Sequence, residues 1–411
     1  MKVTVFPHLL SGALEAVRSK SYAHRILIAA ALSGGQVSFG DSEDARLTAT
    51  ALHALGFEAE FAENSVHYGA FCRPTERREV TVGESGSTLR FLLPLAAALG
   101  VEAQFITAGR LAERPMDALT KTLSRHGAEA TAHSVKGRLT AGRYEIDATV
   151  SSQFVTGLLM ALPLLEGDSE IVLLGRAVSA PYIEITLDVL ASAGIKIERK
   201  EKGFFVRGGQ KYNLKAASVP GDFSGAAFPL VAGALGGKVT LSGLDIASKQ
   251  GDKAVLDALV DAGAEVSLSK QGITVAKRCL NGFTADIGET PDLAPILAVL
   301  AAYAKGRSVL SKVSRLKDKE SDRLFAIREM LSAAGISSRE EGDSLVIEGG
   351  KPRGAAFRTF SDHRMAMAEA VLAAYAEGQS EIDDMTCVKK SYPKFWEDFA
   401  ALGGQYEMER R

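Results

Sequence analysis

Cysteine is scarce in this 411-residue sequence, and Cys72, Cys279 and Cys387 are too few and too scattered for a disulfide framework or a zinc-ligand motif. Uncharged apolar stretches such as 293–304 end after about a dozen residues, whereas a membrane-spanning helix needs about 18. Neither charge predominates, because 48 Lys and Arg face 50 Asp and Glu. The chain therefore has no bulk attraction for nucleic acid.

Targeting and cofactor motifs are also missing. The opening MKVTVFPHLL lacks the apolar segment of a signal peptide, so we expect a cytoplasmic protein that does not bind a membrane. There is no G-x-x-x-x-G-K-[ST], no G-x-G-x-x-G after a strand, no H-E-x-x-H and no C-x-x-C. A P-loop kinase, a dinucleotide enzyme and a zinc enzyme are all poorly supported.

Glycine, by contrast, is abundant, with 40 glycines against 12 prolines. A pattern recurs in which an amphipathic helical stretch is followed by a glycine and then by alternating, strand-like residues. The glycines of this pattern, 67 to 72 residues apart, are Gly56, Gly127, Gly194, Gly263, Gly335 and Gly403. Each stands where a helix C-terminus needs a residue that tolerates positive φ.

An earlier, more apolar helix precedes each of these stretches. Its N-cap is predicted at a Ser or Asp, because such side chains accept a free backbone N–H. The predicted caps are Ser21, Ser87, Ser152, Ser224, Asp292 and Asp362. Six units of about 68 residues are too large for a common solenoid repeat and favour layered α/β domains, with three units in each of two domains.

Basic residues lie beside these helix starts. Helix N-termini attract anions through their free N–H groups and their dipole. The residues concerned are Lys20, Arg25, Arg110, Lys319, Arg323, Arg364 and Lys390. The pattern predicts a site for small molecules rich in phosphate or carboxylate groups.

Seven motifs occur in an order and spacing that carry a family likeness. They are SKSYAHR (19–25), GESGSTLR (83–90), GRLAERP (109–115), SSQF (151–154), KESDRL (319–324), SDHRMAM (361–367) and VKKSYP (388–393). Together they closely resemble the 5-enolpyruvylshikimate-3-phosphate synthase family over essentially the whole chain. The resemblance implies transfer of the enolpyruvyl group of phosphoenolpyruvate to the 5-hydroxyl of shikimate 3-phosphate, in the shikimate pathway of aromatic amino-acid biosynthesis.

The same resemblance implies an α/β fold of two similar domains, each made of three βαβαββ units, with the active site in the interdomain cleft. Domain one is expected to comprise residues 1–18 and 220–411, and domain two residues 19–219. No metal and no organic cofactor is expected. We also expect a monomer whose partners are the two substrates and which binds neither nucleic acid nor membrane.

Site residues carry over by position. The shikimate 3-phosphate site is expected to comprise Lys20, Ser21, Arg25, Ser151, Ser152, Gln153, Ser179, Tyr182, Asp292 and Lys319. The phosphoenolpyruvate site is expected to comprise Lys20, Gly86, Arg110, Gln153, Arg323, Arg364 and Lys390. Asp292 matches the base that removes the 5-hydroxyl proton. Glu320 matches the acid that protonates the methylene, with Lys319 and Lys20 as further catalytic groups.

Some positions depart from the family pattern, and two alternatives stay open. Glu84 and Arg315 stand where many members have asparagine, and Arg18 belongs to an AVRS lead-in that lacks proline. Gly86 favours sensitivity to glyphosate, which mimics phosphoenolpyruvate, whereas the Glu84 carboxylate disfavours it. One alternative is a UDP-N-acetylglucosamine enolpyruvyl transferase, whose reactive cysteine is missing from GRLAERP. The other is a non-catalytic anion-binding relative.

Overall fold

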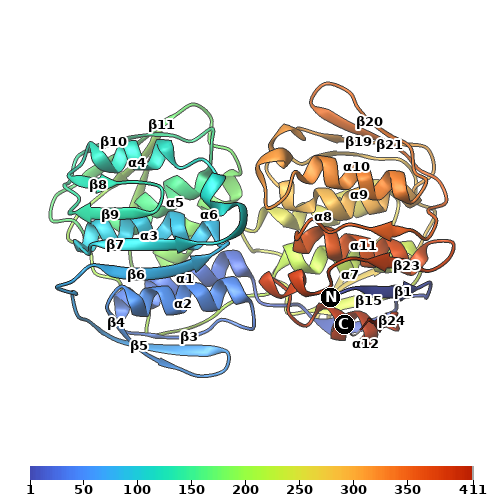
Figure 1. The fold of residues 1–411 in the computed structure, drawn as a ribbon, viewed down its shortest axis with the longest axis horizontal. Helices are drawn as coiled ribbons and strands as arrows, with labels where there is room; N and C mark the ends of the chain where they lie inside the picture. Colours follow the sequence, from blue (N-terminus) through green and yellow to red (C-terminus); the bar gives the residue numbers. More distant parts are fainter. Residues whose placement is uncertain (410–411) are drawn as a thin grey trace. The chain divides into compact units, whose positions relative to one another are not determined.

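The chain passes twice between two units in the computed structural model, which describes residues 1–409 (Figure 1). Unit 1 comprises Met1–Ser19 and the chain from Pro220 onward, and unit 2 comprises Lys20–Val219. The bounds expected from the sequence differ at Ser19, which belongs to unit 1. Its backbone N–H donates to the Pro220 carbonyl at 2.8 Å, which holds the residue to that unit.

Unit 2 contains three four-stranded sheets and six α-helices. The first sheet has the strand order β14 (Ala216–Ser218), β3 (Gln36–Ser38), β5 (Ser65–Phe71) and β4 (Phe57–Phe61). The second has the order β6 (Arg78–Gly83), β7 (Ala103–Thr107), β9 (Ser134–Gly137) and β8 (Ala128–Ala130). The third has the order β10 (Arg143–Asp147), β11 (Ser169–Leu174), β13 (Gly203–Val206) and β12 (Ile197–Lys200). The helices are α1 (Lys20–Ser33), α2 (Glu43–Ala54), α3 (Gly86–Leu99), α4 (Asp117–Ser124), α5 (Ser152–Ala161) and α6 (Ala180–Ser192), with 3-10 turns η1 (Gly109–Glu113) and η2 (Leu162–Leu164).

Unit 1 has the same composition. Its sheets are β22 (Ala356–Phe357), β23 (Ser380–Ile382), β1 (Val3–Phe6) and β24 (Gln405–Met408); β16 (Glu265–Ser269), β17 (Gly272–Ala276), β15 (Lys238–Ser242) and β2 (Gly12–Glu15); and β18 (Thr284–Asp286), β19 (Arg307–Ser311), β21 (Ser344–Glu348) and β20 (Ser338–Glu340). The helices are α7 (Phe223–Leu235), α8 (Val255–Asp261), α9 (Ala294–Tyr303), α10 (Arg323–Ala333), α11 (His363–Tyr375) and α12 (Phe395–Ala401). The 3-10 turns are η3 (Gly251–Ala254), η4 (Pro291–Leu293), η5 (Ser314–Asp318) and η6 (Thr386–Lys390).

Each sheet follows one βαβαββ plan. Two neighbouring strands are parallel, as β10 and β11 are, and an antiparallel pair completes the sheet. That pair is a hairpin such as β12 and β13 in every sheet except the one in which β1 pairs with β24. Three sheets take a strand from a distant part of the chain: β14 pairs with β3, β2 with β15, and β1 with β23 and β24. The sequence pattern predicted six consecutive repeats. That prediction is incomplete, because three of the repeats include a strand from a distant part of the chain.

The first helix of each repeat lies in the core of its unit. Every residue of α7 is buried, and α9 and α11 are buried except at Tyr303 and Tyr375. A helix that is apolar on all sides needs burial on all sides, and these helices pack against one another. In unit 2, α3 packs against α5 in the same way, whereas α1 packs against α6, the second helix of its repeat.

The helix ends confirm one sequence rule and correct another. All six repeat glycines have positive φ, from +76° at Gly335 to +112° at Gly56. Only Asp362 among the predicted N-caps is a cap; Ser87, Ser152 and Ser224 lie inside their helices. The capping side chains are Ser85, Ser151 and Asp222, which precede the helix with extended backbone. Ser21 is likewise inside α1 and Asp292 inside η4, because a cap must be the last residue before helical geometry begins.

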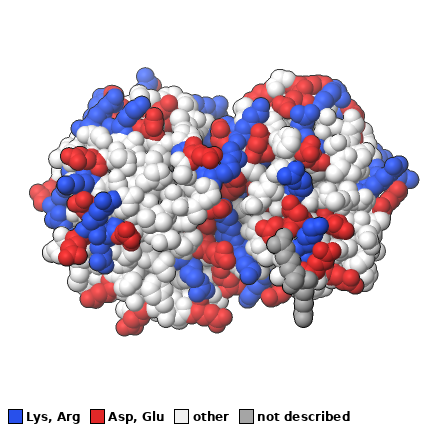
Figure 2. All heavy atoms as spheres, in the orientation of Figure 1, with Lys and Arg blue, Asp and Glu red and all other residues white. Residues whose placement is uncertain are grey.

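Charged side chains are mixed over the surface. On the face drawn in Figure 2, Lys and Arg are interspersed with Asp and Glu over each unit, in keeping with a net charge of −2. Within residues 1–409, no helix combines the length and apolar character that crossing a bilayer requires.

Candidate active site

The predicted site residues lie in both units, and within each unit they form a separate set of polar contacts. In unit 2, Lys20 is the first residue of α1, and its Nζ lies 3.1 Å from the Asp44 carboxylate of α2. Arg25 follows one turn later and is 2% exposed. Its guanidinium donates to the hydroxyls of Thr186 at 2.8 Å and Thr156 at 3.2 Å. Because these partners are neutral hydroxyls, they do not neutralise the positive charge of the buried Arg25, and that charge can attract an anion.

Arg25 also donates to two backbone carbonyls, those of Ser21 at 2.7 Å and Tyr182 at 3.0 Å. It thereby joins α1 to the start of α6. No carboxylate of the described residues forms an ion pair with it, and burial lowers its pKa to about 9. Ser179, the residue before α6, has a φ of +53°, a conformation that costs free energy in a residue with a side chain. The structure thus places Ser21, Arg25, Ser179 and Tyr182 together.

A second link joins α3 to α5. Gln153 accepts from Arg90 Nη1 at 2.8 Å and donates to Ser87 Oγ at 2.8 Å. Ser151 caps α5 by accepting from the Gln153 N–H, and Ser152 is its first helical residue. Four side chains therefore fix the starts of two helices relative to each other.

Arg114 packs against Gly86 at the start of α3. A Cβ on Gly86 would lie 2.8 Å from Arg114 Nη1, so a larger residue there would displace the end of the arginine side chain. Arg110 lies in η1, half exposed, with Glu113 3.9 Å away. The Glu84 side chain packs against Gly109, the residue before Arg110. The departure at position 84 thus places a carboxylate near the predicted phosphoenolpyruvate residues.

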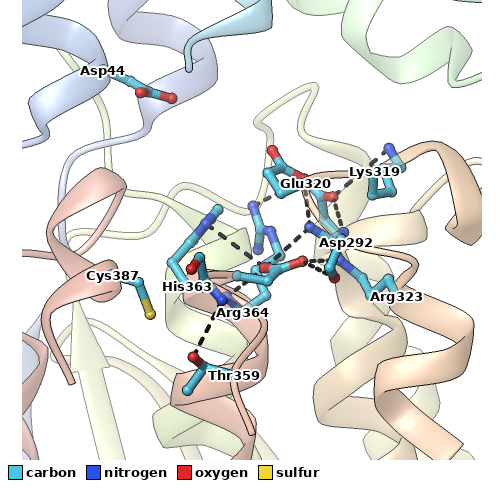
Figure 3. A network of polar contacts seen from close by, with 12 residues as sticks. Asp44, Asp292, Lys319, Glu320, Arg323, Thr359, His363, Arg364 and Cys387 are labelled. Atoms are coloured by element: carbon cyan, nitrogen blue, oxygen red, sulfur yellow. Dashed lines mark hydrogen bonds and ion pairs between the residues drawn. The ribbon is translucent and has the colours of Figure 1, made fainter. Parts of the chain in front are cut away.

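In unit 1, a buried arginine holds three carboxylates. Arg323, whose side chain is 0% exposed, contacts Asp292 at 2.8 Å and Glu320 at 2.8 Å (Figure 3). It also contacts Asp362 at 2.9 Å. Asp362 also accepts from Ser321 Oγ at 3.0 Å and from the Arg364 N–H at 2.9 Å. The predicted ligand residue Arg323 therefore has all its guanidinium nitrogens engaged by the protein.

Asp292 is the carboxylate of this cluster around which the cationic side chains gather. Arg364 Nη2 lies 2.9 Å from it and Lys319 Nζ 3.9 Å (Figure 3). Burial alone raises the pKa of Asp292, but Arg364, Lys319 and Arg323 outweigh burial and hold that pKa well below its ordinary value. Asp292 is therefore ionised, with its charge compensated by these three cations.

Two neighbouring groups titrate closer to neutral pH. Burial lowers the pKa of Lys319 to about 8, against the opposing pull of Asp292. Burial, reinforced by the charge of Asp292, raises the pKa of Asp252 in η3 to about 7. Groups poised in this way near a cluster of charges are characteristic of proton-transfer sites. Lys390, the last predicted residue, is half-buried at the end of η6.

Sequence reasoning missed several members of these groups. Asp362 was expected only as a helix cap, and Asp44, Arg90 and Asp252 were not selected. Arg90 lies within the GESGSTLR motif, and that was its only signal. Asp362 lies within SDHRMAM, whereas Asp44 and Asp252 belong to none of the motifs, and the Lys20 partner of Asp44 lies 24 residues away on another helix. Within residues 1–409, no three His, Cys, Asp or Glu side chains form a group able to hold a metal ion.

Comparisons with known proteins agree with one another. A family model described as EPSP synthase (3-phosphoshikimate 1-carboxyvinyltransferase) matches residues 6–399. Proteins named 3-phosphoshikimate 1-carboxyvinyltransferase from Clostridium kluyveri and Methanothrix thermoacetophila are each 39% identical over 417 residues, covering 98% of this chain and 98% of theirs.

Solved structures show the same fold at lower identity. An EPSP synthase from Acinetobacter baumannii matches with a TM-score of 0.82 at 24% identity, covering 99% of this chain and 100% of that one. The enolpyruvyl transferase NikO from Streptomyces tendae matches with a TM-score of 0.79 at 18% identity, covering 99% and 98%.

Proposed function

Because this chain belongs to the EPSP synthase (3-phosphoshikimate 1-carboxyvinyltransferase) family, we propose that it joins phosphoenolpyruvate to the 5-hydroxyl of shikimate 3-phosphate and releases inorganic phosphate. The observation that carries the proposal is the Asp292 cluster. It combines an ionised carboxylate with two arginines and a lysine of lowered pKa, whose charged nitrogens lie 2.8 to 3.9 Å from the Asp292 oxygens. That set suits a reaction between two anions that needs proton transfer.

The proposed reaction has an addition and an elimination. In the addition, Asp292 accepts the proton of the 5-hydroxyl as its oxygen bonds to C2 of phosphoenolpyruvate, and Glu320 supplies a proton to the methylene. The product is a tetrahedral ketal. In the elimination, a methyl proton returns to Glu320, the C2–O bond to phosphate breaks as the leaving phosphate takes the proton from Asp292, and the double bond reforms. General acid and base groups each contribute about 10²- to 10⁴-fold.

The cations lower the repulsion between the substrates. Each substrate carries a carboxylate and a phosphate, and such groups repel strongly at low dielectric unless cations lie between them. Arginine donates bidentately to either group, and lysine acts as a point charge. We assign shikimate 3-phosphate to Lys20, Ser21, Arg25, Ser151, Ser152, Gln153, Ser179, Tyr182, Asp292 and Lys319. We assign phosphoenolpyruvate to Lys20, Gly86, Arg110, Gln153, Arg323, Arg364 and Lys390.

A phosphate-release assay with both substrates tests the activity. We expect release only when both are present, whereas a non-catalytic anion-binding relative would release none. UDP-N-acetylglucosamine in place of shikimate 3-phosphate should give no phosphate release, because the relatives reported above are named 3-phosphoshikimate 1-carboxyvinyltransferase. The monomeric state and the cytoplasmic location remain predictions, to be checked by light scattering and by cell fractionation.

Arg364→Lys tests the division of ligands. Lysine keeps the charge but not the planar fork, so we expect the KM for phosphoenolpyruvate to rise about tenfold or more while the KM for shikimate 3-phosphate changes little. Equal losses for the two substrates in steady-state kinetics would contradict the assignment.

A further inference from the structure

A buried hydrogen-bond chain joins three helices of unit 2. His24 Nδ1 on α1 lies 2.7 Å from Thr48 Oγ1 on α2, which lies 2.6 Å from Thr88 Oγ1 on α3. Thr88 Oγ1 donates to Ser85 Oγ at 2.8 Å. All four residues are at most 1% exposed. No water can therefore substitute for a missing member without a rearrangement of the core.

The direction of donation in this chain follows from the number of hydrogens. Each threonine hydroxyl has one hydrogen, and Thr88 uses its own on Ser85, so Thr48 donates to Thr88. The longer contact from Thr48 to the Asp44 carbonyl, at 3.2 Å, shares that same hydrogen. Thr48 must then accept from His24, which carries its proton on Nδ1. Burial, with the nearby Lys20 and Arg25 charges, holds the pKa of His24 well below its ordinary value, so the ring is neutral.

Both ends of the chain adjoin proposed substrate residues. At one end, His24 lies between Lys20 and Arg25 on α1, and Lys20 is held by Asp44 of α2. At the other end, Ser85 caps α3 and directly precedes Gly86, whose free backbone N–H begins the helix. Helix α2, which carries no predicted site residue, is the connection between the two.

We propose that His24, Thr48 and Thr88 are positioning residues that hold the N-terminus of α3 in place relative to Lys20 and Arg25. Their hydroxyl and imidazole groups keep Ser85 in its capping position, which directs the Gly86 and Ser87 N–H groups toward an anion. The inference rests on the proposed function, in which Gly86 contacts phosphoenolpyruvate. Loss of the chain should therefore weaken that substrate more than shikimate 3-phosphate and should leave the chemical step largely intact.

Thr88→Val and Thr48→Val test the proposal, since valine keeps the shape and removes the hydroxyl. Thr240→Val is the control for loss of a threonine–threonine contact away from this hydrogen-bond chain, because it removes the partly buried contact with Thr274 Oγ1 at 2.8 Å in unit 1. We expect the KM for phosphoenolpyruvate to rise about tenfold in both test variants, with kcat and the other KM within about twofold of wild type. Thr88→Ser should restore the wild-type KM, because it restores the hydroxyl.

Hydrogen exchange at the Thr88 and Leu89 amides, which donate to Ser85, measures the positioning of the helix start independently of activity. Exchange should be faster in Thr88→Val and Thr48→Val than in wild type, and unchanged in Thr88→Ser and Thr240→Val. Unchanged exchange, or an equal rise of both KM values, would overturn the inference. Absence of phosphate release by the wild-type enzyme would instead overturn the proposed function. Thr48→Val leaves Thr88 Oγ1 bonded to Ser85 but removes its connection to α1 and α2, so it serves as the test variant should Thr88→Val not fold.

Discussion

Replacing Asp362 by asparagine removes one negative charge from the buried cluster while keeping the side chain's shape. Asn Oδ1 can still accept from the Arg364 N–H, so the cap of α11 persists. The other carboxylate oxygen, which accepts from Arg323 Nε at 2.9 Å and from Ser321 at 3.0 Å, becomes an NH₂ group facing a donor. The variant therefore isolates the charge and hydrogen-bond contribution of one buried ion pair.

The cost follows from burial. Removing one partner of a buried ion pair destabilises a protein by about 3–5 kcal/mol, because the other charge is left without compensation. Arg323 keeps Asp292 and Glu320, so we expect the lower end, about 3 kcal/mol. Asp286→Asn is the matched control, since the Asp286–Lys312 pair is about half exposed and such pairs contribute about 0–1 kcal/mol.

Urea unfolding followed by circular dichroism measures both values. The Asp362→Asn transition should shift to lower urea with an unchanged slope, and the Asp286→Asn transition should barely move. Added salt should leave the first shift largely intact, because screening acts on exposed charges. A loss no larger than that of Asp286→Asn would refute the reasoning and show that Asp292 and Glu320 alone satisfy Arg323.

Three further changes have defined outcomes. Asp292→Ala should lower kcat at least about 10²-fold with folding intact, and near-normal turnover would remove Asp292 from the mechanism. Lys319 is cationic below its pKa of about 8, so kcat/KM should fall as pH rises through that value. Lys319→Arg should move the loss to higher pH, and an identical profile would exclude Lys319 as its origin. Glu369 is 0% exposed with no hydrogen-bond partner for its oxygens, and burial, with Asp383 and Asp362, raises its pKa well above the ordinary 4.5. The folded protein then keeps a proton that the unfolded chain releases, so this group's contribution to stability declines as pH rises above 4.5. Glu369→Gln should therefore raise the melting temperature more at pH 8 than at pH 5; equal gains would contradict this.

Local rules predicted much of the fold. The repeat glycines were identified because a helix end with positive φ needs glycine whatever the surroundings are. The N-caps were misplaced by one or two residues because several Ser and Asp stand near each helix start, and only backbone geometry selects the capping one. Strands β1, β2 and β14 could not be assigned to their sheets from the sequence. A short strand pairs with whichever sheet edge is unpaired in the folded unit, and that edge belongs to a distant part of the chain.

For the site, too, some features followed from the sequence and others only from the tertiary structure. The motifs from SKSYAHR to VKKSYP determined the family and which cations stand at helix starts, because residue type and spacing are properties of the sequence itself. Only the tertiary structure decided which carboxylates accompany those cations. Asp292 meets Arg364 from 72 residues away, and Asp44 meets Lys20 across two helices. Charge pairing depends on distance in space, and no local pattern encodes which distant side chains the packed helices bring together.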